Sequence, residues 1–336
     1  MRILFIGGTK RGYLTLKALV ESGASVNGVI SLRQDEHEIE RCENMIESFS
    51  GEFNISCYET KLFKDKDYAQ IISREIQPDI AYVVGSRVMI SKEIYELPPL
   101  GTLCVHDSYL PEYRGFAPLN WSIINGEDHT GVTLFYLNEL MDGGDIVAQT
   151  RVPIGPHDTA PLVYERICKA TVDIVLETHG QLVEGTAPRA RQDYSTGSFT
   201  CSRRPTDGMV DWGKSTLDIY NQIRALTYPY PGAFTYFKGE RLTICKAKPV
   251  ERPLRYVGRI PGRIVGISKA EGWVDALTGD GVLRVFEVQV EGGETTAAAN
   301  VIKSVRDTLG LSVVDLHDRL RALEAEVTRL VEDCRQ

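Results

Sequence analysis

Leu103–Trp121 reads LCVHDSYLPEYRGFAPLNW, and the interpretation of the whole chain begins there. The stretch opens with an apolar run that ends in His106, as expected of a buried strand followed by a turn. Open α/β sheets bind their ligands where strands end, so His106 is a candidate for a functional site. The alternative is a structural histidine whose hydrogen bonds are satisfied within the core.

Predicted strands and helices alternate before this stretch. Arg11–Gly23 is predicted to form a helix with Gly23 just past its end. GGTKRG, at residues 7–12, fits neither nucleotide-binding fingerprint and is interpreted as a tight turn. Near-continuous apolar strands between helices predict an α/β domain with a Rossmann-like, doubly wound parallel sheet. The predicted strands lie at Arg2–Gly8, Ser25–Ser31, Ile55–Tyr58, Ile80–Val84 and Leu103–His106.

The second half of the chain has a different character. Two more strands flanking a Gly-rich loop, a long helix and a polar linker at Tyr194–Thr206 lead to one helix at Thr216–Thr227. Five short strands with regular turn signals then predict a small β-barrel or sandwich. We therefore expect three parts: residues 1–202, residues 203–295, and a helical tail at residues 296–336.

The tail carries an apolar seam. Its members are spaced alternately three and four residues apart over about three heptads, which is the a/d pattern of a coiled coil. We expect this helix to act as a dimerisation arm, giving a homodimer; the alternative is a terminal helix packed on its own domain. The seam consists of Val313, Leu316, Leu320, Leu323, Val327, Leu330 and Cys334.

Composition limits the classes of partner. The net charge of −8 argues against tight binding to nucleic acid or to an anionic membrane. Seven widely spaced cysteines without a CxxC motif are expected to be reduced thiols in a cytoplasmic protein. The N-terminal apolar run is too short for a signal-peptide core, and no run reaches the length of a membrane span.

Asp142 is the natural partner for His106. It lies in MDGGDI, a Gly-rich loop that follows a predicted strand, and glycines let a backbone come close to a ligand. A histidine and a carboxylate at two strand ends would meet in one cleft. The carboxylate would orient the imidazole and stabilise its protonated form, giving a proton-transfer pair.

His106–Gln149 resembles the signature of the folate-dependent formyltransferase family. The family pattern is Asn-x-His-x-Ser-Leu-Leu-Pro-x-Tyr-Arg-Gly, then Pro and Trp, Gly-Glu-x-x-Thr-Gly-Val-Thr, and Asp-x-Gly-x-Ile. Asp207–Tyr236 is similar to the family's domain junction. APLNW and PYPGAF look most like the enzymes that formylate nucleotide-linked amino sugars. Methionyl-tRNA formyltransferases, the other large branch, need a surface for RNA, which an acidic chain is poorly suited to provide.

The resemblance implies a Rossmann-like catalytic domain at residues 1–202, a smaller OB-like β-barrel domain after it, and a reaction. A formyl group would pass from 10-formyltetrahydrofolate to the primary amine of a nucleotide-linked amino sugar, without a metal. His106 would donate to the tetrahedral oxyanion or relay the proton of the amine. Asp142 would hold His106 and help to pass a proton to the leaving folate nitrogen.

The family positions also imply where the folate lies. It would contact the backbone around four consecutive residues and the loop from Asn138 to Asp142. The four residues are Ser86, Arg87, Val88 and Met89. The alternative for this segment is a plain turn from strand to helix.

Cys104 departs from the family pattern, which has asparagine at this position. A thiol is a weaker hydrogen-bond donor than an amide, and losing one oxyanion donor typically slows a reaction about a hundred- to a thousandfold. Three explanations stay open: another group supplies the donor, the protein hydrolyses 10-formyltetrahydrofolate, or it binds folate or nucleotide with little catalysis. A nucleophilic role for Cys104 lacks an adjacent cation.

Five residues are candidates for contact with the acceptor. Arg114 and Asn120 follow the His106 turn and would face the sugar, although Arg114 would alternatively brace the loop. Arg203 and Arg204 suit a diphosphate, because guanidinium groups bind phosphate in a bidentate manner; the alternative is a solvated pair. Tyr230 would stack on the nucleotide base.

Overall fold

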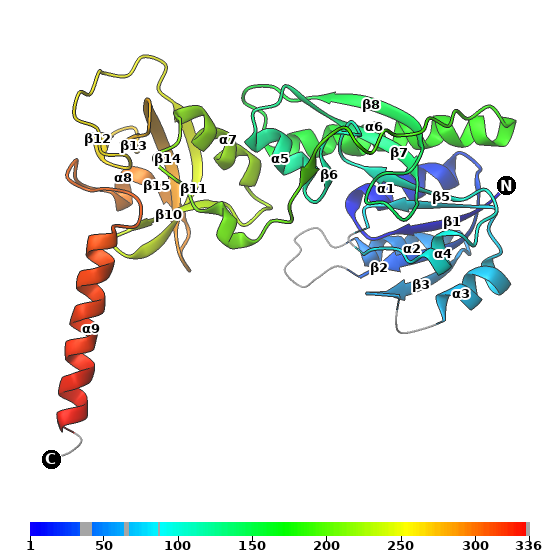
Figure 1. Ribbon diagram of the computed structural model, residues 1–336, viewed down its shortest axis with the longest axis horizontal. Coiled ribbons are helices and arrows are strands. Elements are labelled where there is room, and N and C mark those ends of the chain that lie inside the picture. Colours follow the sequence, from blue (N-terminus) through cyan, green and yellow to red (C-terminus); the bar gives the residue numbers. More distant parts are fainter. Residues whose placement is uncertain (34–41, 64–66, 87, 334–336) are drawn as a thin grey trace. The chain divides into compact units, whose positions relative to one another are not determined.

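The computed structural model describes residues 1–33, 42–63, 67–86 and 88–333. The chain divides into two compact units, Met1–Arg203 and Arg204–Gln336. Each unit is built around its own sheet (Figure 1). No helix in these described ranges is long and apolar enough to cross a membrane.

The first unit holds a seven-stranded sheet with the order β3-β2-β1-β4-β5-β7-β8. The strands from β3 to β5 pair in parallel, whereas β7 pairs antiparallel with both β5 and β8. The predicted Rossmann-like sheet is confirmed, but it is mixed at one edge instead of wholly parallel. Its strands are β1 (Arg2–Gly7), β2 (Ser25–Leu32), β3 (Ser56–Thr60), β4 (Ile80–Val84), β5 (Thr102–His106), β7 (His129–Tyr136) and β8 (Ile146–Pro153).

Helices cover this sheet. The long helix α6 packs on β7, β8 and α1, and it ends at Gly185, whose φ of +72° is the left-handed conformation that glycine adopts freely. β6 (Arg114–Gly115) and β9 (Phe199–Thr200) form a separate two-stranded ladder. The helices are α1 (Lys10–Glu21), α2 (Glu43–Glu52), α3 (Tyr68–Gln70), the π-helix η1 (Ile71–Ile76), α4 (Lys92–Tyr95), α5 (Pro118–Ile124) and α6 (Ala160–Glu184).

The turn between β1 and α1 is tight, as predicted. Thr9 caps α1 by accepting a hydrogen bond from the Gly12 N–H. A Cβ atom on Gly12, in the first turn of α1, would lie 3.0 Å from the carbonyl oxygen of Val84, so glycine lets the start of α1 lie directly over the end of β4. This close approach brings the first turn of α1 to the carboxyl edge of the sheet.

The second unit is an antiparallel β domain with one covering helix. Its ladders run β10-β11-β14-β13-β12, and β15 pairs with β14. The end strands β10 and β12 share no ladder in the described part of the chain, but residues 307–310 bond to both: the Ile264 N–H donates to the Asp307 carbonyl oxygen, and the Gly310 N–H donates to the Tyr236 carbonyl oxygen. The predicted second, smaller β domain is confirmed. The strands are β10 (Ala233–Phe237), β11 (Glu240–Pro249), β12 (Ile264–Ser268), β13 (Trp273–Leu277), β14 (Val282–Val290) and β15 (Thr295–Ala297).

Helix α7 (Thr216–Leu226) packs on β10, β11 and β14, after the short 3-10 helix η2 (Pro205–Gly208). Ser215 caps α7 by accepting from the Asp218 N–H at 3.1 Å. Trp212 is buried, and its indole N–H donates to the hydroxyl oxygen of Thr235 on β10. The domain ends with α8 (Ala298–Val301), and α9 (Val313–Asp333) follows it as the predicted terminal helix.

Candidate active site

His106 is the last residue of β5, and only 8% of it is exposed. Its Nε2 lies 2.8 Å from the backbone carbonyl oxygen of Tyr113. Because a carbonyl can only accept, Nε2 carries the proton in this bond. Nδ1 is then the nitrogen that can take up a proton, and it faces Asp142 with its Oδ2 at 3.7 Å. The two residues that the sequence analysis paired therefore lie together.

Asp142 reaches this position by a longer path than the sequence suggested. Because β7 is antiparallel to β5, the end of β7 lies beside Leu103, away from His106. The loop after β7 starts with the N–H of Leu137 bonded to the carbonyl oxygen of Thr102. It must then return along β5 before Asp142 approaches His106. The two residues thus meet because a loop folds back, and not because two strands end at one edge.

Several contacts fix the Asp142 loop. Asp142 Oδ2 accepts from the Gly115 N–H at 2.7 Å, and Asp142 itself has a φ of +48°, a strained conformation for a residue other than glycine. The buried side chain of Gln192 donates to the carbonyl oxygens of Asp142 and Gly144 at 2.9 and 2.7 Å. A Cβ atom on Gly144 would collide with the carbonyl oxygen of Tyr136. The sequence analysis missed Gln192, which lies in an irregular segment without periodicity.

Arg114 supports the same loop through its hydrogen bond to Gln192. It is fully buried, and its guanidinium donates to Gln192 Oε1 at 2.9 Å and to the carbonyl oxygen of Thr196 at 3.0 Å. The group also lies 4.3 Å from the centre of the Tyr194 ring. No part of this side chain is exposed to a ligand. The structure thus favours the bracing role that was the alternative for Arg114, and not contact with a sugar.

Cys104 shares the face of β5 that carries His106, since the two residues are separated by one position on the strand. Burial, reinforced by the negative charge of Asp142, raises the pKa of the Cys104 thiol to about 12. The thiol is therefore neutral near pH 7, so it is neither a thiolate nucleophile nor a strong donor.

We expect Cys104 to resist alkylation while the exposed Cys201 reacts. With a pKa of about 12, roughly one Cys104 thiol in ten thousand is a thiolate at pH 8, and the rate should rise about tenfold per pH unit. Peptide mapping after timed iodoacetamide treatment of the folded protein measures this order, with Cys201→Ser as the control. Labelling of Cys104 as fast as Cys201 at pH 8 would contradict the neutral thiol.

The residues assigned to folate lie in two segments, one after β4 and one after β7. Ser86 follows β4 and exchanges hydrogen bonds with the backbone of Val88, which is half-buried, while Met89 is 75% exposed. The segment is thus a turn after a strand, in agreement with the plain alternative, and it leaves an apolar side chain exposed. Arg87 lies outside the described residues. Asn138 is exposed, and its side chain accepts from the Leu140 N–H within its own loop.

Two of the other acceptor candidates lie in the first unit and two in the second. Asn120 is buried on α5. In the first unit, the Arg203 guanidinium lies 4.7 Å from the centre of the Trp121 ring. In the second unit, Arg204 is exposed at the start of η2, and Tyr230 is half-buried, with its N–H bonded to the Thr227 carbonyl oxygen.

A buried ion pair beside His106 was not predicted. Arg11, in the first turn of α1, pairs with Asp107, the residue that follows His106. Arg11 is only 7% exposed. Nothing in the local sequence of either residue signals the pair, because they are brought together by the tight turn after β1. The pair ties the chain that leaves β5 to the start of α1.

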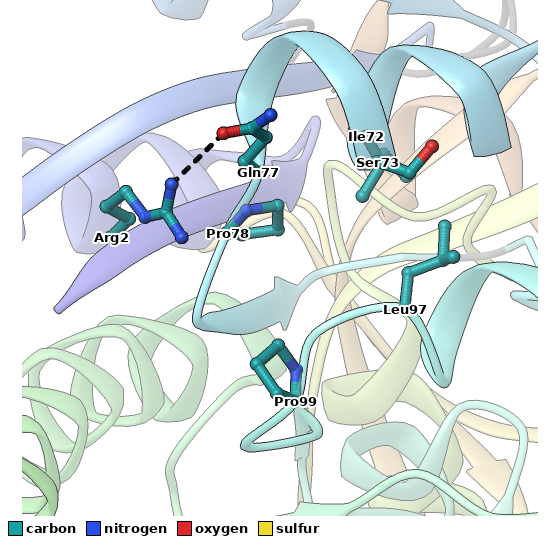
Figure 2. Close-up of a pocket in the computed structure, with 7 residues that line it drawn as sticks. All are labelled: Arg2, Ile72, Ser73, Gln77, Pro78, Leu97 and Pro99. Carbon is teal, nitrogen blue, oxygen red and sulfur yellow. Dashed lines mark hydrogen bonds between the residues drawn. The ribbon is translucent and has the colours of Figure 1, made fainter.

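A cavity of about 290 Å³ lies elsewhere in the first unit. Arg2, Pro78 and Pro99, which line it, stand at or just before the amino ends of β1, β4 and β5. Figure 2 shows Arg2 hydrogen-bonded to Gln77 across its mouth. This cavity is therefore at the sheet edge opposite His106 and takes no part in the candidate active site.

Comparison with known proteins agrees with this geometry. A family model described as formyl transferase matches residues 1–178, and one for the formyl transferase C-terminal domain matches residues 203–306. The chain belongs to the formyl transferase family. Its activity is accordingly that of a folate-dependent formyltransferase, and the family resemblance drawn from His106–Gln149 is confirmed.

Relatives within the family carry different names. A methionyl-tRNA formyltransferase of Symbiobacterium thermophilum is 34% identical over 297 residues, which cover 87% of this chain and 89% of the relative. The bifunctional polymyxin resistance protein ArnA of Wigglesworthia glossinidia brevipalpis is 33% identical over 249 residues, 74% of this chain and 38% of that protein.

Solved structures share the fold. An N-formyltransferase from Helicobacter canadensis, crystallised with folinic acid and dTDP-3-aminofucose, superposes with a TM-score of 0.64 at 17% identity. The match covers 88% of this chain and 99% of that one. At this identity the likeness shows the fold alone.

Proposed function

We propose that this formyltransferase transfers the formyl group of 10-formyltetrahydrofolate to the primary amine of a nucleotide-linked amino sugar. The observation that carries the chemistry is the His106–Asp142 pair, in which a fixed imidazole presents Nδ1 to a carboxylate oxygen 3.7 Å away. Such a pair can move a proton between an attacking amine and a leaving nitrogen.

Each residue of the site has its own role in the proposed reaction. The folate supplies the formyl group and the leaving nitrogen. His106 Nδ1 takes the proton that the amine loses as its nitrogen bonds to the formyl carbon, and Asp142 stabilises the imidazolium that results. The bond from the formyl carbon to the folate nitrogen then breaks, and Nδ1 returns the proton to that nitrogen. The Arg114–Gln192 brace keeps the Asp142 loop in place during this transfer. Another group would have to supply the oxyanion donor that asparagine supplies in the family, because the Cys104 thiol is a weak donor.

The exposed apolar side chains near the site suit a folate. Met89 follows β4, and Leu140 and Met141 precede Asp142 in its loop; they are 75%, 42% and 36% exposed. Apolar side chains beside a few fixed polar groups are typical of sites for flat heterocyclic ligands. We accordingly propose that the pteridine ring lies against these three side chains, close to the His106–Asp142 pair.

The choice of acceptor rests on charge. A chain with a net charge of −8 lacks the excess of cations with which proteins neutralise the phosphates of RNA. A nucleotide sugar needs only a local pair of cations, and Arg203 and Arg204 stand at the junction of the two units in the sequence. We place the reaction in the cytoplasm, where the free thiols that the structure describes would stay reduced.

Methionyl-tRNA is the second candidate acceptor. It is favoured by relatives named methionyl-tRNA formyltransferase, which are 30–34% identical over most of both chains. Two further outcomes follow from Cys104: water could replace the amine, giving a hydrolase, or folate could bind without turnover.

One assay separates these functions. The protein is incubated with 10-formyltetrahydrofolate alone, with UDP- and dTDP-linked amino sugars, and with methionyl-tRNA, and tetrahydrofolate release is followed. We expect release that depends on an amino sugar. Release that depends on methionyl-tRNA would replace the sugar proposal, release without any amine would indicate hydrolysis, and folate binding without release would indicate lost catalysis.

A further inference from the structure

Within the part of the chain that the structure describes, no element covers the apolar seam of α9. Its six described members are between 48% and 81% exposed, although they lie on one side of a 21-residue helix. They are Val313, Leu316, Leu320, Leu323, Val327 and Leu330; Cys334 lies outside the described residues. The packing of this helix on its own domain, which the sequence analysis left open, is therefore not seen for these side chains. Figure 1 shows α9 as a single helix that extends away from the strands of the β domain. Arg319, in its second turn, lies beside Gly239 in the turn between β10 and β11.

The residues just before α9 are bound to the β domain. Leu309 is buried, and the Gly310 N–H donates to the Tyr236 carbonyl oxygen on β10 at 2.8 Å. The helix begins only three residues later, and its first turn is closed by the Leu316 N–H bonded to the Ser312 carbonyl oxygen. The family match ends at residue 306, so α9 is an addition to the shared fold with no part in the site described above.

The residues of the seam favour a partner of the same kind. With Val313 at position a, the d positions are all leucine and two of the three described a positions are valine. β-Branched residues at a with leucine at d are the combination that favours parallel, two-stranded coiled coils. A spacing that averages 3.5 residues keeps the seam directed at one partner helix along its whole length.

Charges beside the seam are complementary to a second copy. In a parallel, in-register pair, position g of one helix faces position e of the next heptad in the other. Arg319 at g then faces Glu324 at e, and symmetry gives this opposite-charge contact twice. Glu326 at the next g position faces Val331, so no like charges meet there.

We propose that α9 pairs with α9 of a second copy in a parallel, two-stranded coiled coil, which makes the protein a homodimer. The pairing covers the six seam side chains, and it requires the Arg319 side chain to turn from its place beside Gly239 towards the partner helix. It is independent of the acceptor, because a mass measurement tests it without any assay of formyl transfer.

The first test removes the seam. Light scattering of the full chain should give two chain masses, and Leu320→Glu with Leu323→Glu should give one. The matched control is Ala322→Glu with Ala325→Glu, which adds the same charges at the outer c and f positions and should remain dimeric. A monomeric unmodified chain, a higher oligomer, or a dimer that survives the seam substitutions would overturn the proposal.

The second test sets the orientation. Arg319→Glu and Glu324→Arg should each shift the dimer towards monomer at low salt, and the two together should restore it, because the parallel contact is then reversed in sign. In an antiparallel pair Arg319 would face Glu326 instead. Restoration of Arg319→Glu by Glu326→Arg, and not by Glu324→Arg, would overturn the parallel arrangement.

Discussion

Replacing His106 with alanine is expected to lower formyl transfer at least about a hundredfold, the lower end of the usual contribution of a general acid or base. The substitution removes Nδ1, the nitrogen that faces Asp142 at 3.7 Å. It also frees the Tyr113 carbonyl oxygen, which water can satisfy. The measurement is the initial rate of amine-dependent tetrahydrofolate release, with circular dichroism to show that the variant is folded.

His129 provides the control for this experiment. It lies in the same sheet, at the start of β7, but its side chain is partly exposed and pairs with its neighbour Asp128. His129→Ala should leave the rate within about twofold of the original, since it removes an exposed pair of small energetic value. A folded His106→Ala protein with near-normal turnover would remove the imidazole from the mechanism.

Arg114→Met is expected to lower the free energy of unfolding by about 3 kcal/mol, because buried acceptors left unpaired typically cost 1–3 kcal/mol each. Gln192 Oε1 would lose its donor in a buried bond, and the Thr196 carbonyl oxygen would lose its donor in a partly buried one. Urea unfolding followed by fluorescence measures the change as a lower transition midpoint at constant slope.

Arg189→Met is the matched control for that loss. Arg189 pairs with Asp145 at 2.7 Å, but its side chain is 61% exposed, and surface ion pairs contribute at most about 1 kcal/mol. Formyl transfer by the Arg114→Met protein should also fall under conditions where it is folded, because Gln192 holds the Asp142 loop. Equal stability of the two variants would mean that Arg114 does not brace the loop.

The strands and the pair at the centre of the site were accessible from sequence because their signals are local. The apolar run before His106 predicts a buried strand end, and a Gly-rich loop predicts a close backbone approach near Asp142. The path between them was not accessible, since nothing in GVTLFYL says that its strand is antiparallel to β5. An isolated sequence gives the period of a strand but not the direction of its neighbour.

Arginine was the residue type that sequence reasoning placed least well. Arg114 was predicted to contact a ligand, but its donors meet carbonyl oxygens that come from residues near 192–196. Arg11 was not predicted to be buried, although it is paired with Asp107. The burial of a guanidinium depends on acceptors far away in the sequence, so no local pattern reveals it. The heptad seam of α9, by contrast, is local and was readable at once.

The hydrogen bond from His106 Nε2 to the Tyr113 carbonyl oxygen fixes which edge of the imidazole faces the reactants. It prevents the ring from turning over, so a proton that enters at Nδ1 can leave only from Nδ1. In the proposed reaction, the incoming amine and the departing folate nitrogen must then approach the same edge of the imidazole. An inhibitor that joins mimics of both molecules should accordingly be bent like a hairpin, with its two nitrogens side by side, and a linear one should bind poorly.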